Sequence, residues 1–220
     1  MFSFFGISLV FAEPTIEKWY LPNEEKRQEL TKVYMEQHCG ESCSEAGAYS
    51  VYMTPKMVVV HWTAGSTAKS AWYTFSPATL HGRKSIARGG ALNVSSQYLI
   101  DRDGTIYELL PPTRIARHCI GLNHLSIGIE NVGDGKKYPL TDAQIASNIA
   151  LIRHLKEQYP ITHLIGHHEH NLFRSHPFFQ ERDPQYRTSK PDPGNEVMDR
   201  IRKGLLDLNL EGVPQVSPTE

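Results

Sequence analysis

Short apolar runs recur along the middle of the chain, each bounded by residues that favour turns. The stretch KMVVVHW lies between Pro55 and Gly65, and the stretches SIGIENVG and ITHLIG have the same character. Runs of this length, rich in β-branched residues, predict buried strands. In SSQYLIDRDGTIYELL, two alternating runs flank Asp103 and Gly104, a pair that predicts a β-hairpin.

Three other stretches have the spacing of amphipathic helices. Asn23 precedes EEKRQELTKVYMEQH and is expected to cap this helix. Thr141 and Gln144 form a capping box that opens a second helix, which runs to about Gln158. A last helix is predicted in NEVMDRIRKGLLDLN, residues 195–209. Strands that alternate with helices favour a single α/β domain with a central, mostly buried sheet flanked by helices.

The two ends of the chain differ from its middle. The first twelve residues, MFSFFGISLVFA, are apolar, but the run is too short to cross a hydrocarbon layer of about 30 Å. Its length and its end at Val10-Phe11-Ala12 favour a secretory signal peptide that lacks a basic start; a buried N-terminal strand is the alternative. The sequence therefore predicts a signal peptide at 1–12, a helical extension at 13–50, one functional domain at 51–208 and a flexible tail at 209–220.

Composition narrows the class of protein. A chain of 220 residues can bury a proper core, and 23 Lys and Arg against 24 Asp and Glu give no field that attracts nucleic acid or an anionic membrane. Of the three cysteines, Cys39 and Cys43 are spaced for a local disulfide in an oxidising compartment, which leaves Cys119 free. His38 beside that pair suggests a metal site as the alternative, but no fourth ligand is near.

The histidines are concentrated where strands end. Four of the eleven lie in HLIGHHEH, and His167 follows one predicted strand while His61 closes another. Ligand sites in open α/β sheets form at the carboxyl ends of strands, so these two imidazoles are expected to meet there. Asp192, in the turn TSKPDPG, offers a third donor. Two histidines, one carboxylate and an open position are typical of a catalytic zinc site. In an extended segment neighbouring side chains point to opposite faces, so His168 is expected to point away from the metal. His168 and His170 are then expected to lie at the surface or to support the ligands without binding the metal.

Several of these stretches together resemble a known family. VVVHWTAG, SSQYLIDRDGTIYELLPPTRIARHCIGLN, SIGIENVG, LIGHHE and SKPDPG resemble, in the same order, the blocks of the type 2 N-acetylmuramoyl-L-alanine amidases. That family includes AmpD and AmiD and is related to the peptidoglycan recognition proteins. The resemblance spans Met57 to Gly194. It implies the fold of those proteins, one zinc ion, and hydrolysis of the amide between N-acetylmuramic acid and L-alanine in peptidoglycan or muropeptides.

The resemblance also implies roles for single residues. His61, His167 and Asp192 match the metal ligands of the family, as the strand ends already suggested. Glu130 matches its catalytic glutamate and Lys190 its transition-state lysine. His118 and Asn123 fall in a block that lines the substrate groove. Ser96 stands where one branch of the superfamily has a tyrosine, which places this chain with the glutamate-using branch.

The chain departs from the family in the spacing between His167 and Asp192. Compact members join these blocks by a short loop, whereas here HNLFRSHPFFQERDPQYRT is inserted. Residues 171–188 of this insertion are expected to form a wall over the substrate cleft. Two other functions remain open: a receptor that binds peptidoglycan without cleaving it, and a zinc peptidase that cuts stem peptides. We expect a periplasmic or secreted monomer with no nucleic-acid partner and no stable membrane span.

Overall fold

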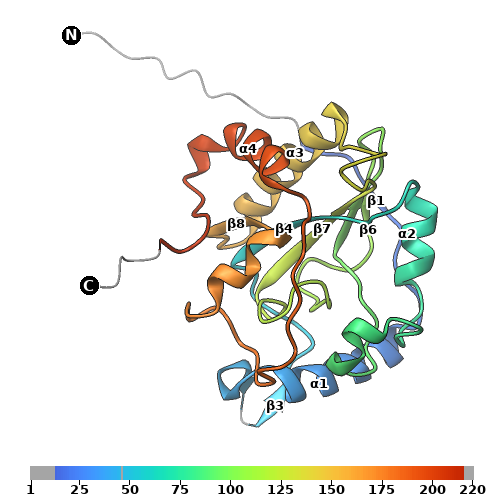
Figure 1. Ribbon diagram of the computed structural model, residues 1–220, viewed down its shortest axis with the longest axis vertical. Helices are drawn as coiled ribbons and strands as arrows, with labels where there is room; N and C mark the ends of the chain where they lie inside the picture. Colours follow the sequence, from blue (N-terminus) through green and yellow to red (C-terminus); the bar gives the residue numbers. More distant parts are fainter. Residues whose placement is uncertain (1–12, 46, 216–220) are drawn as a thin grey trace.

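The computed structural model describes residues 13–45 and 47–215 (Figure 1). The predicted signal peptide at 1–12 lies outside these residues. A six-stranded sheet runs through the centre in the order β1-β6-β5-β7-β4-β8, and a short pair, β2 and β3, stands apart from it. The strands are β1 Ile16–Lys18, β2 Ser44–Glu45, β3 Ala48–Tyr49, β4 Met57–Trp62, β5 Tyr98–Ile100, β6 Ile106–Glu108, β7 Ser126–Asn131 and β8 His163–Gly166. The helices are α1 Glu24–His38, α2 Ala68–Phe75, α3 Asp142–Gln158 and α4 Asn195–Lys203, with short 3₁₀ helices η1 Glu41–Cys43, η2 Lys84–Gly89, η3 His167–Phe173 and η4 Leu206–Leu208.

The middle of the sheet consists of parallel strands, and these are buried, as the apolar runs predicted. β4 pairs with β7 on one side and β8 on the other, both in parallel. Val58, Val59 and Val60 of β4 are fully buried because layers of structure cover both faces of the sheet. Strands buried on both faces lose the alternation of polar and apolar residues, which explains the unbroken VVV.

The predicted hairpin is confirmed at the other side of the sheet. β5 and β6 pair antiparallel, and β5 also pairs with β7 in parallel. The connecting turn is closed by hydrogen bonds from Asp101 N to Thr105 O (2.9 Å) and from Gly104 N to Asp101 O (3.0 Å). Gly104 adopts a φ of 93°, a conformation that favours glycine.

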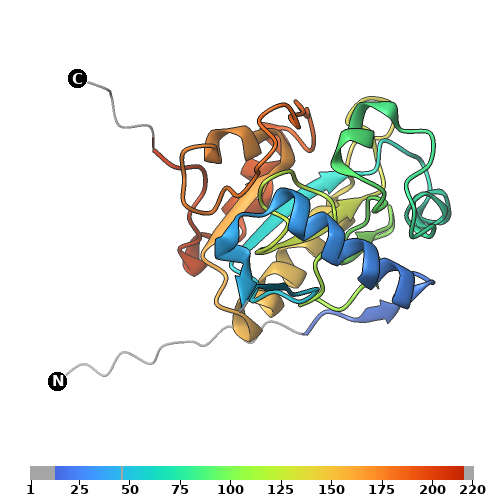
Figure 2. The same cartoon turned by 90° about the horizontal axis from the view of Figure 1, so that it is seen from below.

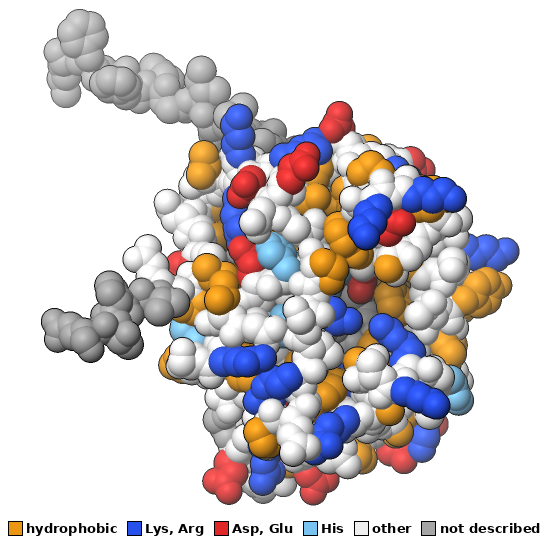
Figure 3. Space-filling view, viewed as in Figure 1, with side chains coloured by type: hydrophobic (Ala, Val, Ile, Leu, Met, Phe, Trp, Pro, Cys, Tyr) orange, Lys and Arg blue, Asp and Glu red, His pale blue; other side chains and the backbone are white. Residues whose placement is uncertain are grey.

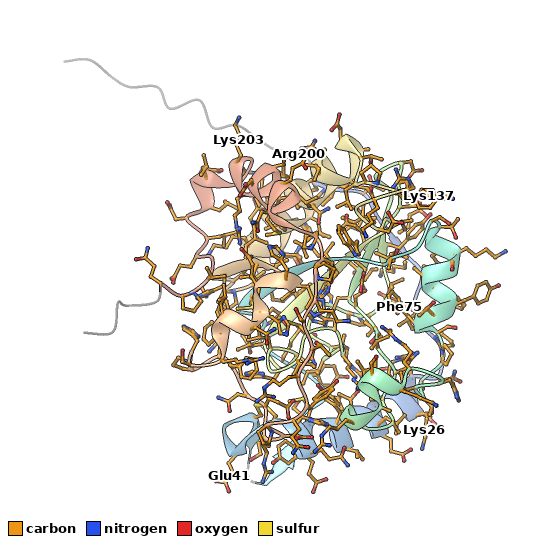
Figure 4. All side chains as sticks on the ribbon, viewed as in Figure 1. Lys26, Glu41, Phe75, Lys137, Arg200 and Lys203 are labelled. Carbon is orange, nitrogen blue, oxygen red and sulfur yellow. A yellow bond between two sulfur atoms is a disulfide. The ribbon has the colours of Figure 1, made fainter. Side chains whose placement is uncertain are left out.

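Helices cover the two faces of the sheet. α3 and α4 contribute Ile152 and Met198 to the same buried cluster as Val58 and Val60, whereas α2 packs Phe75 against Leu99 of β5. Phe75 points from α2 toward the interior in Figure 4. α1 lies at the lower end of the molecule in Figure 1 and nearest the viewer in Figure 2.

The N-terminal extension is part of the same core. β1 pairs with β6 in parallel, and α1 contributes Leu30, Tyr34 and Met35 to the main buried cluster. The helix has the predicted bounds, but Asn23 adopts a left-handed conformation (φ 62°) and its side chain makes no capping hydrogen bond. The expected Asn23 side-chain cap is therefore wrong.

Other helix ends follow their local sequence. At α3, the Thr141 side chain accepts from Gln144 N and the Gln144 side chain accepts from Thr141 N, so the predicted capping box is confirmed. The last helix is shorter than predicted, because α4 ends at Lys203 before Gly204 and is followed by η4. Beyond it, the segment expected as a flexible tail is fastened at Glu211, whose carbonyl accepts from Leu164 N (2.9 Å).

The cysteines have the predicted arrangement. Cys39 and Cys43 form a disulfide at the end of α1, and Cys119 is free and buried. Within residues 13–45 and 47–215, no helix has both the length and the apolar character needed to cross a membrane.

Candidate metal centre

Two imidazoles and one carboxylate converge at the end of the central strands. His61 Nδ1 lies 2.9 Å from His167 Nδ1 and 3.3 Å from Asp192 Oδ2, and His167 Nδ1 lies 3.1 Å from the same oxygen. All three side chains are buried. These three donor atoms, together called the donor group, lie close enough to one another to bind one small cation.

The sheet register brings these residues together. β4 and β8 pair so that Val60 lies beside Gly166, and therefore His61 and His167 leave the two strands at the same level. The loop that contains Asp192 is attached to η3 by His168, whose backbone N–H donates to Asp192 O (2.7 Å) and whose Nδ1 lies 3.2 Å from that oxygen. His168 thus points to the Asp192 backbone rather than to the donor group. The segment is a 3₁₀ helix, so the expectation that it is extended was wrong. His170 is buried rather than at the surface, and its Nδ1 lies 2.7 Å from His167 O.

Burial controls the charge of the donor group. Burial, aided by the nearby His167, lowers the pKa of His61 to about 4, and burial also lowers the pKa of His167. Burial acts to raise the pKa of Asp192, but a hydrogen bond with His167 and the proximity of His61 hold it well below its usual range. The group therefore consists of two neutral imidazoles and a carboxylate, which is the form that binds a metal ion.

Glu130 and Lys190 face the same space as the donor group. They line a cavity of about 280 Å³ together with His61, His167 and Asp192. Glu130 lies beside His61 in the β4–β7 register, which sets its height in the cavity. Figure 3 shows a hollow near the centre of this face, with an acidic side chain visible in it and Lys and Arg side chains nearby.

The Glu130 carboxyl is held in an unusual state. Burial raises its pKa well above the usual range, Asp192 acts in the same direction, and Lys190 and Arg83 act against them. Its Oε2 is buried and has no hydrogen-bond partner among the described residues. A buried polar atom without a partner is costly unless the site uses it. Glu130 is thus placed to exchange a proton with a molecule in the cavity.

His118 and Asn123 line the cavity, but both also bond within the protein. Asn123 Oδ1 accepts from His118 N (2.9 Å) and Cys119 N (2.7 Å), and Asn123 Nδ2 donates to Tyr34 OH (3.0 Å). His118 Nδ1 lies 3.0 Å from His61 Nε2. Asn123 therefore holds a turn and attaches it to α1, and His118 contacts a candidate metal ligand.

The insertion supplies part of the cavity wall. Tyr186 and Thr188 line the cavity, and Phe173 packs in the core beside Val59. The insertion is attached to α1 through Arg182 N, which donates to His38 O (2.9 Å), and through a hydrogen bond between His38 Nδ1 and Glu181 Oε1 (2.9 Å). Its contacts explain why a long segment without strands or long helices has a defined position.

Two arginines at the cavity were not predicted. Arg83 precedes η2, and Arg117 is buried, where it donates to Tyr186 OH and to the carbonyls of Ile86 and Leu92. Nothing in the sequence around Arg83 indicates a role at the site. Arg117 directly precedes His118 in RIARHCIGLN, a stretch that resembles the amidases, and this position could have indicated it. A second group of possible metal ligands consists of Cys39, Cys43 and His124. Both sulfurs are in the disulfide, so this group offers no thiolate to a metal ion.

Comparisons with known proteins identify the family and the fold of this chain. The family model described as N-acetylmuramoyl-L-alanine amidase (Amidase_2) matches residues 51–195. Among curated protein sequences, none matches significantly. The fold is similar to that of the endolysin amidase LysCS from Clostridium intestinale URNW (TM-score 0.53, 21% identity, 91% of this chain and 99% of that one).

Two further solved structures have the same fold. A selenomethionine derivative of AmpD aligns with a TM-score of 0.52 and 22% identity over 86% of this chain and 93% of that one. Bumblebee PGRP-SA aligns with a TM-score of 0.50 and 20% identity over 92% and 99%. At these identities the structures show the fold, and the family match, which spans more than half of the chain, shows the membership. The chain belongs to the N-acetylmuramoyl-L-alanine amidase family, of the type 2 class.

Proposed function

We propose that this protein hydrolyses the amide bond between N-acetylmuramic acid and L-alanine in peptidoglycan or its fragments. The observation that carries the proposal is the placement of a buried His-His-Asp group and an unpartnered glutamate oxygen in one cavity. Membership of the amidase family supports the choice of bond. Such a substrate belongs to the cell envelope, which agrees with the export predicted from residues 1–12.

The donor group fits one zinc ion. His61, His167 and Asp192 would hold it, because neutral imidazole nitrogens and a carboxylate are common zinc ligands and three protein ligands leave one position open. Bound zinc lowers the pKa of a water to about 7 and polarises the substrate carbonyl.

Glu130 and Lys190 would carry the proton and the charge. Glu130 takes a proton from the attacking water and gives it to the leaving nitrogen of L-alanine, so the C–N bond breaks as a neutral amine departs. The burial that raises the pKa of Glu130 helps it to hold that proton between the two steps. The Lys190 ammonium faces the same cavity and stabilises the oxyanion that forms on the carbonyl oxygen.

Product analysis tests the proposal. Purified sacculi are incubated with zinc-loaded protein, and the soluble products are identified by mass spectrometry. We expect intact stem peptides that begin with L-alanine, together with glycan chains that carry free muramic acid carboxyls. Peptides cut at internal bonds would indicate a peptidase instead. Binding to sacculi with no released product would indicate a receptor.

A matched pair of variants controls for contaminating hydrolases. His167→Ala removes a donor, whereas His154→Ala removes a histidine of α3 whose ring bonds to Gln158, away from the cavity. The first variant should release no peptide and the second should match the wild type. Equal release by both would mean that the activity comes from another protein.

A further inference from the structure

We propose that His118 is a positioning residue that fixes the tautomer and the orientation of His61, and so aims His61 Nδ1 at the metal ion. This inference rests on the proposed function only in that it takes His61 as a metal ligand. The resemblance to the amidases implied substrate contact for His118. The contacts of both ring nitrogens assign it a different task.

The hydrogen of the His118 ring can be located from its neighbours. His118 Nε2 lies 3.1 Å from the carbonyl oxygen of Ser126 and 3.4 Å from Ser126 Oγ. The carbonyl can only accept. The Ser126 hydroxyl donates its hydrogen to Leu122 O (2.7 Å), so it also faces His118 as an acceptor. His118 Nε2 therefore carries the hydrogen and donates it.

The position of the hydrogen on the His61 ring follows from that on His118. In a neutral ring that carries its hydrogen on Nε2, Nδ1 has a lone pair and accepts. His118 Nδ1 lies 3.0 Å from His61 Nε2, so His61 Nε2 must carry the hydrogen of that bond. The lone pair of His61 is then on Nδ1, the atom that faces His167 and Asp192. A backbone carbonyl thus determines, through two rings, which nitrogen of His61 is free to bind metal.

The neighbours of His118 hold the ring in place. Asn123 Oδ1 accepts from the His118 backbone N–H. Gly128 of β7 lies against the ring, and a Cβ at this position would come within 3.0 Å of His118 Cγ, Cδ2 and Nδ1. Real Cβ atoms avoid such contacts, so the glycine inside the strand SIGIEN makes room for the imidazole. The rings of His61 and His118 are nearly perpendicular (88°), so they meet edge to face rather than stack.

Hydrogen bonds of this kind have a known effect on metal binding. A partner that bonds to the remote nitrogen of a histidine ligand fixes its tautomer and orientation, and its loss typically weakens metal affinity by about 10–100-fold. Because both nitrogens of His118 are already engaged, a substrate could use this ring only by breaking one of the two bonds. The positioning role and the substrate role therefore predict different measurements.

The experiment measures zinc affinity by competition with a chelator, on the full chain. His118→Leu should weaken zinc binding about 10–100-fold. His118→Gln should recover much of that loss, because its amide can accept from His61 and donate to Ser126. Gly128→Ala, which leaves the His118 side chain present but displaces its ring, should also weaken zinc binding. His154→Leu is the control and should bind zinc like the wild type.

A second measurement is independent of affinity. Nitrogen-15 NMR of the histidine rings should show His61 and His118 each carrying hydrogen on Nε2 in the metal-free protein. A hydrogen on His61 Nδ1 would overturn the proposal. So would unchanged zinc affinity in His118→Leu with a raised KM, which would mark His118 as a substrate contact.

The two proposals fail in different ways. If the wild type binds zinc but releases no peptide from sacculi, the amidase function fails while the affinities still decide the role of His118. If peptide is released and His118→Leu binds zinc normally, the amidase function stands and the role of His118 is refuted. Thermal unfolding of each variant without zinc separates a local effect on the ligand from a loss of fold.

Discussion

Replacement of Glu130 by glutamine is the sharpest test of the proposed chemistry. The change keeps the size of the side chain and leaves His61, His167 and Asp192 untouched, so the protein should still bind one zinc ion. It removes the carboxylate that would accept a proton from water. In the structure this carboxyl has a buried oxygen without a partner and a raised pKa, and an amide in its place has no carboxyl to take up and release a proton.

The expected loss can be stated as a rate. A positioned general acid–base group contributes about 10²–10⁴-fold, which corresponds to roughly 2.7–5.4 kcal/mol of transition-state stabilisation. The loss should fall on kcat, because the proton moves only in the transition state, and affinity for muropeptide should change little. Steady-state hydrolysis of a purified muropeptide and calorimetric binding measure the two separately.

A control and a refuting result complete this test. Glu108→Gln changes another half-buried strand glutamate, which bonds to Tyr20 OH and does not line the cavity, and its turnover should match the wild type. If Glu130→Gln retains nearly full turnover while binding one zinc, Glu130 is not the base. If it loses zinc, Glu130 belongs to the donor group and the assignment of three ligands is wrong.

Further predictions concern the metal, the core and the thiols. His61→Ala, His167→Ala and Asp192→Ala should each lose stoichiometric zinc, and His168→Ala and His170→Ala should keep it; metal analysis of the purified variants decides, and loss of zinc in the His168 variant alone would shift the ligand by one residue. Ile152→Ala should lower the free energy of unfolding by about 2–5 kcal/mol, because Ile152 is fully buried against the sheet; urea denaturation measures it, and a loss below about 1 kcal/mol would contradict the packing. Unfolded, unreduced protein should offer one alkylatable thiol, Cys119, and three after reduction; three thiols before reduction would exclude the disulfide.

Most of the sheet could be predicted from the sequence because its signals are local. The run around Val59 is apolar throughout, and a strand buried on both faces shows that pattern. The capping box of α3 and the turn at Gly104 are also set by residues within a few positions of each other. The strand order, α2 and the short edge strand β1 depend on distant partners and gave no comparable signal.

In the candidate site, too, some residues could be predicted from local sequence and others could not. His61 and His167 could be predicted to meet because each marks the end of an apolar strand. The contact of His118 with His61 could not, because it depends on how the loop before β7 folds beneath β4 and on the space left at Gly128. The path of the insertion likewise depends on its attachment to α1 at His38, and nothing in its own composition encodes that contact.

The donors of the candidate metal centre are far apart along the chain: His167 follows His61 by 106 positions, and Asp192 follows His167 by 25. An unfolded chain cannot gather such distant groups at low cost, since each loop must close before a contact can form. Zinc would therefore bind late in folding and would act as a ligand of the native state alone. By mass action, free zinc at 100 times its Kd would add about 2.7 kcal/mol to the stability of the fold. Zinc supply would then govern the survival of this protein against proteases as well as its catalysis.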